Sequence, residues 1–152
     1  MKIRTMTLAD YDAVYGLWLS CPGMGLNDVD DSPEGIAAFL RRNPETCLVA
    51  EEGGAIIGVV MARSDGRRGY IYHTAVRPDR QGCGIGAALV DEVLDALKRL
   101  GIHKVALVVF NRNEGGNAFW EKQGFTVRTY ITSRKRALTD TRRIDTSHDS
   151  PY

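Results

Sequence analysis

The chain has 152 residues, of which 43% are hydrophobic and 26% charged, and its formal net charge at pH 7 is +1. These values are typical of one globular domain, and the nearly neutral charge argues against nucleic acid as a partner. No run of about 18 apolar residues is present and the N-terminus lacks the apolar core of a signal peptide, so we expect a cytoplasmic protein without membrane association. The three cysteines lie far apart in no metal-binding pattern, which predicts reduced thiols and no metal site.

Two helices are predicted near the N-terminus, after a short strand around Ile3. Thr7 and Asp10 have the spacing of a capping box and mark the start of the first helix. Ser32, followed by proline at the first helical position, marks the start of the second. Residues 22–31 form the loop between these two helices.

The middle of the chain predicts a sheet followed by a βαβ unit. Residues 46–51 and 55–62 are rich in β-formers and flank two glycines, which predicts a hairpin. Residues 70–76 add a third antiparallel strand. An amphipathic pattern at residues 85–100 predicts a helix, and the apolar run at 104–109 predicts a strand that is buried on both faces.

A short helix at residues 117–123 and a last strand at residues 125–132 complete the predicted elements. The element order is β-α-α-β-β-β-α-β-α-β, which predicts an α/β (α+β) fold with a mixed central sheet and helices on both faces. We expect a single domain at residues 1–138. Residues 139–152 are polar and show no periodicity, which indicates a flexible C-terminal tail.

The most informative motif is a glycine-rich loop, Arg80 to Ala87, at the start of the long predicted helix. Three alternate glycines and the positive end of a helix dipole favour close backbone contact with an anion, most plausibly a phosphate. The spacing Gly82-x-Gly84-x-x-Ala87 also satisfies the dinucleotide-binding pattern. The acidic residue about 20 positions later and the repeated βαβ units of that fold are missing, as is the Gly-Lys-Ser/Thr ending of a Walker loop.

Residues 81–86 resemble the Q/R-x-x-G-x-G/A loop of the GNAT family of N-acetyltransferases, in which backbone amides hold the pyrophosphate of acetyl-coenzyme A (acetyl-CoA). Residues 75–78 resemble the end of the family's fourth strand. Asn113 with residues 118–125 resembles its Asn…Leu-Tyr-Glu-Lys-x-Gly-Phe segment. The resemblance covers residues 1–138, and the predicted element order agrees with the family's fold. Further pairs that resemble the small bacterial YpeA branch lie at residues 17–18, 27–28, 65–66 and 68–69.

The resemblance implies an N-acetyltransferase that moves an acetyl group from acetyl-CoA directly to a primary amine of a small molecule, protein or peptide. The residues that it assigns to acetyl-CoA binding are Thr74, Ala75 and Val76 on the fourth strand, Gln81, Gly82, Cys83, Gly84, Ile85 and Gly86 in the loop, and Asn113 and Trp120 further on. Trp120 departs from the family, which commonly has a tyrosine there as general acid for the coenzyme A thiolate. An indole cannot supply that proton. An alternative is therefore an acyl-CoA-binding regulatory module or pseudoenzyme with weak or no transferase activity.

Proton transfer at the predicted site has several candidates. His73 is the best-placed titratable side chain on the fourth strand and is the first candidate for the general base. Tyr72 competes with it through an ordered water, and strand alternation predicts that the two side chains lie on opposite faces of the sheet. The thiolate leaves unprotonated near the helix dipole, or water or Tyr130 supplies its proton.

The acceptor end of the site is less clearly marked in the sequence. Asp28 and Asn27, in the loop between the first two helices, are candidates for binding a cationic acceptor, although loop aspartates commonly serve as turn residues. Trp18 is a candidate for lining the acceptor groove, with burial in the core as the simpler explanation. The sequence leaves the identity of the amine open and allows a homodimer.

Overall fold

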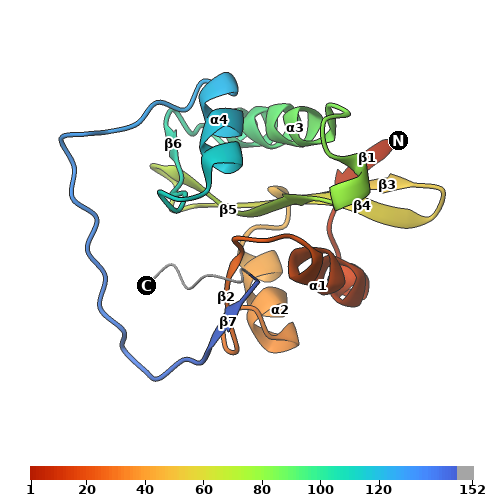
Figure 1. Cartoon of the computed structure of the whole chain (residues 1–152), viewed down its shortest axis with the longest axis horizontal. Coiled ribbons are helices and arrows are strands. Elements are labelled where there is room, and N and C mark those ends of the chain that lie inside the picture. The colour runs from red at the N-terminus through yellow and green to blue at the C-terminus, as the bar shows by residue number, and fades with distance from the viewer. Residues whose placement is uncertain (147–152) are drawn as a thin grey trace.

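The computed structural model describes residues 1–146 as a mixed sheet with helices on both faces (Figure 1). In spatial order the five strands are β1 (Lys2–Thr5), β3 (Cys47–Glu52), β4 (Ala55–Ser64), β5 (Gly69–Val76) and β6 (Val105–Ala106). Neighbouring strands from β1 to β5 are antiparallel, whereas β6 is parallel to β5. The predicted fold class, the hairpin and the βαβ unit are thus confirmed.

Two N-terminal helices, α1 (Tyr11–Ser20) and α2 (Pro33–Arg42), cover one face of the sheet (Figure 1). A short 3-10 turn, η1 (Leu8–Asp10), leads into α1, and the Thr7 N–H donates to Asp10 Oδ2 at 2.9 Å. At the start of α2, Ser32 Oγ accepts from the Gly35 N–H at 3.0 Å. Both predicted helix starts are confirmed, because each depends on a cap encoded within four residues.

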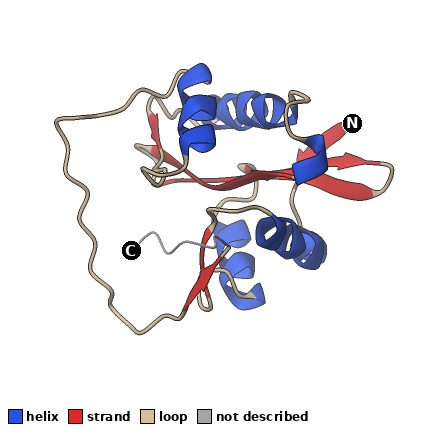
Figure 2. Ribbon diagram, in the orientation of Figure 1, coloured by secondary structure: helices blue, strands red, loops and turns tan. Residues whose placement is uncertain are grey.

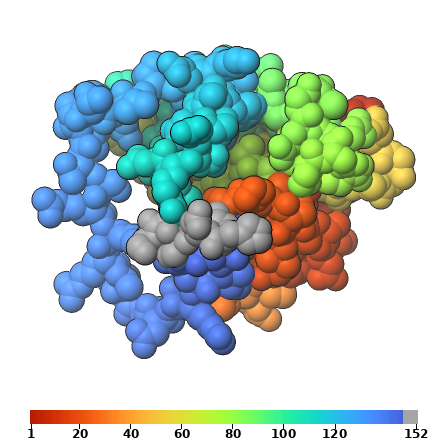
Figure 3. Space-filling model, viewed as in Figure 1, coloured from red at the N-terminus to blue at the C-terminus, as the bar shows by residue number. Residues whose placement is uncertain are grey.

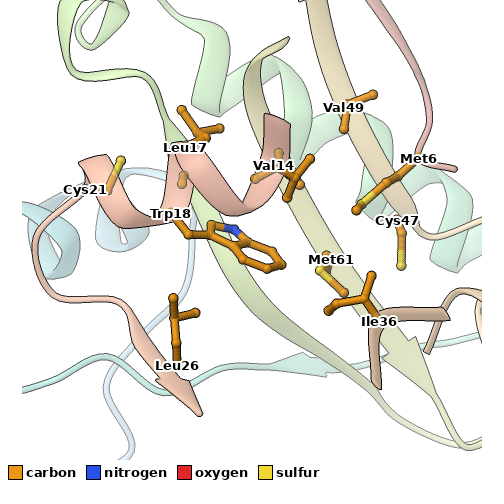
Figure 4. Packing of buried hydrophobic residues seen from close by; sticks show 12 residues of the cluster. Met6, Val14, Leu17, Trp18, Cys21, Leu26, Ile36, Cys47, Val49 and Met61 are labelled. Atoms are coloured by element: carbon orange, nitrogen blue, oxygen red, sulfur yellow. The ribbon is translucent and has the colours of Figure 1, made fainter. Parts of the chain in front are cut away.

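The core on this face is built around Trp18, which is completely buried. Figure 4 shows its indole projecting from α1 toward Met61 of β4 and Ile36 of α2. Truncating a buried aromatic of this kind costs about 3–5 kcal/mol. Trp18 therefore fixes the position of α1 against the sheet.

The opposite face is covered by α3 (Ile85–Arg99) and α4 (Glu114–Lys122), and a 3-10 turn, η2 (Pro78–Arg80), connects β5 to the loop before α3. Leu89, Val93 and Leu97 of α3 pack into the second core, as the helical periodicity predicts. The helix α4 begins earlier than predicted, because Asn113 Oδ1 accepts from the Gly116 N–H at 2.9 Å and caps an additional turn.

The prediction of a strand at residues 125–132 is wrong. This segment has no regular structure, and Val127 and Tyr130 are each 83% exposed. It continues into a long loop that arcs away from the sheet (Figure 2) and ends in β7 (Arg143–Asp145). There β7 pairs antiparallel with β2 (Gly25–Asn27), so that part of the predicted tail forms a strand. Residues 147–152 of that tail lie outside the described residues.

The strand predicted at residues 104–109 is also much shorter than expected and lies at the edge of the sheet. Only Val105 and Ala106 pair with β5, and Val108 is 70% exposed rather than buried. A β-prone segment needs a long edge with which to exchange backbone hydrogen bonds, and β6 offers two residues. A strand at residues 125–132 therefore lacks an edge with which to pair. Within residues 1–146, no helix has the length and apolarity that crossing a membrane requires.

Candidate active site

A long groove follows β5 and is lined by segments from both helical layers. Its volume is about 2010 Å³, beyond the roughly 300–1,000 Å³ of a site for one small ligand. One end of the groove lies at Gly86 and Val76, which are close enough that a Cβ added to Gly86 would be 3.5 Å from Val76. The other end lies at Tyr70 of β5 and Arg63 of β4, which are opposite each other in the sheet. In Figure 3 the surface is hollowed between the chain near residue 80 (green) and the chain near residue 110 (teal). The groove has room for two substrates placed end to end along β5.

The glycine loop lies at the Val76 end of the groove and has a backbone suited to an anion. Gly82 and Gly84 have φ of +75° and +83°, and a Cβ on either would meet nothing within 4 Å, so backbone conformation requires glycine here. Gly84 caps α3 without a side chain, which leaves the first N–H groups of the helix available to a ligand. Gln81 Nε2 donates to the Val76 carbonyl at 3.0 Å and holds the loop against β5.

A bulge interrupts β5 in the middle of the groove. The register with β4 shifts between Val59 and Met61, so that two residues of β5, His73 and Thr74, stand where one would in a regular ladder. His73 has a φ of +24°, the only positive value of a non-glycine residue among residues 1–146. For a residue with a large side chain this is a strained backbone, of the kind that clusters at functional sites.

The bulge places Tyr72 and His73 on the same face of the sheet. The Tyr72 ring centroid lies 5.8 Å from that of Phe39 in α2, and the His73 ring centroid lies 5.0 Å from that of Trp18 in α1. The prediction that strand alternation separates these two side chains is therefore wrong. Both line the groove on the side of the N-terminal helices.

The structure pairs His73 with Asp31, a residue that the sequence reasoning missed. His73 Nε2 lies 2.6 Å from Asp31 Oδ1, and Asp31 Oδ2 accepts from the Asn27 N–H at 2.8 Å. The Asp31 side chain is only 3% exposed. A buried carboxylate bound in this way fixes the orientation of the imidazole and favours the tautomer with its proton on Nε2.

The other ring nitrogen of His73 is open to the groove. Nδ1 has no hydrogen-bond partner among residues 1–146, and in that range no fully buried side-chain nitrogen or oxygen lacks one. The side chain is 18% exposed and lines the groove. Nδ1 is thus an accessible proton acceptor, held in place by a carboxylate on the opposite side of the ring.

The two predicted acceptor-binding residues of the loop have other partners. Asp28 Oδ1 accepts from the Arg142 N–H at 2.6 Å beside β7, and Asp28 does not line the groove. Asn27 lines the groove, but its Oδ1 accepts from the N–H groups of Val29 and Asp30. Asp30 and Asp31 of this loop line the groove instead; Asp30 Oδ2 accepts from Asn27 Nδ2, whereas Asp31, directly before the cap of α2, is the one that contacts His73. The only sequence signal for Asp31 is membership of the same acidic loop.

Two further predicted residues lie away from the groove surface. Trp18 is completely buried and does not line the groove, so its predicted substrate contact is not formed. Its indole N–H donates to the His73 carbonyl at 3.3 Å and supports the bulge from behind. Tyr130 is 83% exposed in the long loop and does not line the groove, which leaves it badly placed to protonate a leaving group there.

Ten of the eleven residues that the resemblance assigns to the cofactor line the groove. Those that line the groove are Thr74, Ala75, Val76, Gln81, Gly82, Gly84, Ile85, Gly86, Asn113 and Trp120. Cys83 is exposed but does not line it. Trp120 packs against Phe119 and Phe125, with ring centroids 5.0 and 5.2 Å away, and so forms part of an aromatic wall.

Other titratable groups beside the groove hold their protons tightly. Burial raises the pKa of Tyr70 and that of the Cys21 thiol, whose Sγ lies 3.4 Å from the Val76 carbonyl oxygen. Both remain protonated near neutral pH. Within residues 1–146, no three His, Cys, Asp or Glu side chains are grouped so as to hold a metal ion.

The fold is a mixed α/β sheet between two helical layers, with a glycine loop at one end of β5 and a histidine–aspartate pair at its bulge. An acetyltransferase of Pectobacterium atrosepticum is 35% identical over 140 residues, which are 92% of this chain and 98% of that protein. The sequence model of the acetyltransferase (GNAT) family matches residues 11–125. The chain therefore belongs to the acetyltransferase (GNAT) family, and it is an acyltransferase by class.

Solved structures share the fold at lower sequence identity. Ard1 from Thermoplasma volcanium superposes with a TM-score of 0.75 at 23% identity, covering 84% of this chain and 83% of that one. The PaiA N-acetyltransferase from Thermoplasma acidophilum, in complex with coenzyme A, gives a TM-score of 0.73 at 18% identity, covering 84% and 90%. These two superpositions show that the proteins share the same arrangement of helices and strands.

Proposed function

We propose that the protein transfers an acetyl group from acetyl-CoA directly to the nitrogen of a primary amine. The observation that carries the proposal is one continuous groove, which joins the anion site of α3 to the Asp31–His73 pair. Direct transfer requires both substrates in one site, and the volume of the groove suits two.

The α3 end of the groove fits the pyrophosphate of acetyl-CoA. Gly82 and Gly84 expose backbone N–H groups at the positive end of the helix dipole, where a phosphate is stabilised. The coenzyme A bound to PaiA, which has the same fold, supports this choice. Residues 74–76 and Trp120 line the groove between this loop and the bulge, where the pantetheine arm would lie.

The bulge fits the chemistry of the amine. An alkyl amine is mostly protonated near pH 7 and must lose a proton before it can attack a thioester. His73 Nδ1 faces the groove as an acceptor, while Asp31 holds the opposite nitrogen. Nδ1 takes the first proton from the ammonium and releases it to water. As the neutral amine then attacks, the nitrogen–carbon bond forms, the carbon–sulfur bond breaks, and the second nitrogen proton passes to Nδ1. The thiolate leaves with the electron pair and takes its proton from water, because Trp120 cannot supply one.

The test measures thiol release from acetyl-CoA with a panel of small amines and N-terminal peptides. We expect at least one amine to raise release well above the background hydrolysis. His73→Gln should lower kcat/KM about 10²-fold, the range of a lost general base, and flatten the acidic side of the pH profile. His103 is exposed and does not line the groove, so His103→Gln is the matched control.

The alternative function, an acyl-CoA-binding module without turnover, rests on Trp120 at the position of the family's usual tyrosine. It predicts tight binding of acetyl-CoA in calorimetry and no amine-dependent thiol release. That pair of results would refute the transferase proposal and leave the cofactor site intact.

A further inference from the structure

Beyond Tyr72 the groove ends at an arginine without an acidic partner. Arg63 of β4 is partly buried, and its Nε donates to the Tyr72 hydroxyl at 3.0 Å. Its Cζ lies 5.2 Å from the ring centroid of Tyr70 and 5.8 Å from that of Tyr72. Two aromatic rings thus hold the guanidinium in place, and its two terminal nitrogens remain available.

Four other arginines among residues 1–146 have their charge matched by a carboxylate, and the arginines outside these pairs, apart from Arg63, are exposed to solvent. Arginine–carboxylate pairs form at Arg4–Asp10, Arg77–Asp79, Arg80–Glu52 and Arg143–Asp145. No such pair forms between Arg63 and any carboxylate of residues 1–146. The nearby Asp65 carboxylate instead accepts from the backbone N–H groups of Arg67 and Arg68, at 2.8 and 2.7 Å. The N–H groups of Arg68 and Arg67 and, less strongly, the charge of Arg63 lower the pKa of Asp65, so Asp65 lies near Arg63 without pairing with it. A partly buried guanidinium that is held by two rings and forms no ion pair suits bidentate binding of a carboxylate or phosphate.

The position of this guanidinium relates it to the proposed amine site. Arg63, Tyr72 and His73 all line the groove, and Tyr72 lies between the other two, its ring centroid 6.2 Å from that of His73. Arg42, at the end of α2, lines the same groove, and the neighbouring Asn43 Oδ1 accepts from the Ser64 N–H at 3.3 Å. The groove therefore has a proton acceptor at the bulge and positive charge about one tyrosine ring further along.

We infer that the acceptor is an amine that also carries an anionic group, which Arg63 binds while the amine lies at the Asp31–His73 pair. This inference rests on the proposed function. The anion is a carboxylate or a phosphate, because the planar fork of arginine matches both. An extended peptide advances about 3.3–3.6 Å per residue, so an amino acid to a dipeptide has the length to span one tyrosine ring.

The experiment compares acceptors that differ in the anionic group. Glycylglycine is paired with glycylglycine amide, and phosphoethanolamine with ethanolamine, so the two pairs distinguish a carboxylate from a phosphate. We expect the anionic member of one pair to have a kcat/KM at least about tenfold higher, mainly through a lower KM, because a bidentate charge-assisted contact is gained.

Variants then assign the preference to Arg63. Arg63→Gln should reduce the ratio within the pair toward one and leave acetyl-CoA affinity unchanged. Arg63→Lys keeps the charge but loses the planar fork, and should retain part of the ratio. Arg67→Gln is the matched control, because Arg67 is exposed in the β4–β5 turn and does not line the groove. Urea midpoints of all three variants report whether the fold is kept.

A binding measurement separates failure of this inference from failure of the proposed function. Glycylglycine and phosphoethanolamine are titrated calorimetrically into the protein–coenzyme A complex of the wild type and of Arg63→Gln. Turnover with amines but equal kcat/KM within both pairs overturns the inference and keeps the transferase. Arg63-dependent binding without turnover keeps the anion site and refutes the transferase. If neither turnover nor binding favours the anionic member, the anion site is refuted.

Discussion

Replacing Asp31 with asparagine tests whether the carboxylate positions His73. The side chain keeps its size, but its two oxygens, which accept from His73 Nε2 and the Asn27 N–H, become one oxygen and one NH₂ group. If the NH₂ group turns to His73, it must donate to Nε2, and the imidazole proton moves to Nδ1. If it turns to Asn27, two donors face each other and the negative charge is still lost. The first orientation keeps both hydrogen bonds but leaves Nδ1 protonated, so the proton acceptor that faces the groove is lost; the second orientation loses the contact with Asn27.

The size of the effect follows from the charge-assisted hydrogen bond that Asp31 makes to His73 and that asparagine cannot make. A hydrogen bond to a charged group contributes about 1.5–3 kcal/mol, which corresponds to a fall in kcat/KM of roughly 10- to 150-fold. An unsatisfied buried donor also costs about 1–3 kcal/mol of unfolding free energy, because Asp31 is 3% exposed. We therefore expect Asp31→Asn to be folded, somewhat less stable and strongly impaired in turnover.

The assay measures kcat/KM against pH for the best amine, together with urea unfolding. Asp28→Asn is the matched control, since it makes the same chemical change on an exposed residue of the same loop outside the groove. A double variant adds a sharper criterion. If Asp31 acts through His73, Asp31→Asn should cause little further loss in a His73→Gln background, because the two residues form one unit.

Two results would refute this reasoning. Asp31→Asn within about twofold of wild-type kcat/KM would mean that the carboxylate does not position the imidazole. Equal losses in Asp31→Asn and Asp28→Asn, both in proportion to lost stability, would reduce Asp31 to a structural role in its loop. The pH profile separates the cases, since a structural defect lowers activity at every pH by a similar factor.

Three further predictions concern the cofactor loop, the N-terminal cap and the aromatic wall. Gly84→Ala forces a side chain to φ +83° and should weaken acetyl-CoA binding in calorimetry. The control is Gly101→Ala, at φ +81° after α3, which carries a similar strain of about 1–2 kcal/mol and should leave acetyl-CoA binding unchanged. Hydrogen bonds from Arg4 lower the pKa of Asp10 in the folded protein. The stability that they contribute is therefore present above the ordinary aspartate pKa and is lost as the pH falls through the lower folded value. Asp10→Asn should reduce this loss of stability in acid, measured as urea midpoints against pH, and an unchanged pH dependence would contradict the assignment. Trp120→Tyr should leave turnover and its pH profile unchanged if protonation of the thiolate is not rate-limiting, and a clear gain in kcat would show that it is.

Features set by neighbouring residues could be predicted from the sequence. Ser32 caps α2 through a bond to a residue three positions away, and the glycine loop before α3 needs only the φ values that glycine permits. The start of α2 and the conformation of the loop before α3 both followed from these local rules. The predicted strand at residues 125–132 failed because β propensity depends on a partner, and β6 offers an edge of two residues. Residues 143–145, in a polar segment, form a strand because β2 supplies an edge.

The pairing of His73 with Asp31 could not be predicted, because it depends on a break in the period-two alternation that assigns side chains to the faces of β5. A period of two places Ala75 on the face opposite Tyr72, yet both pack in the core under α1 and α2, while Val76 packs in the other. The extra residue turns His73 toward Asp31, 42 positions away. A backbone strained in this way persists only when its surroundings fix it, and the buried indole of Trp18 does so through the His73 carbonyl. Trp18 thus contributes to the site from within the core, which explains why an aromatic residue predicted to contact substrate is wholly buried.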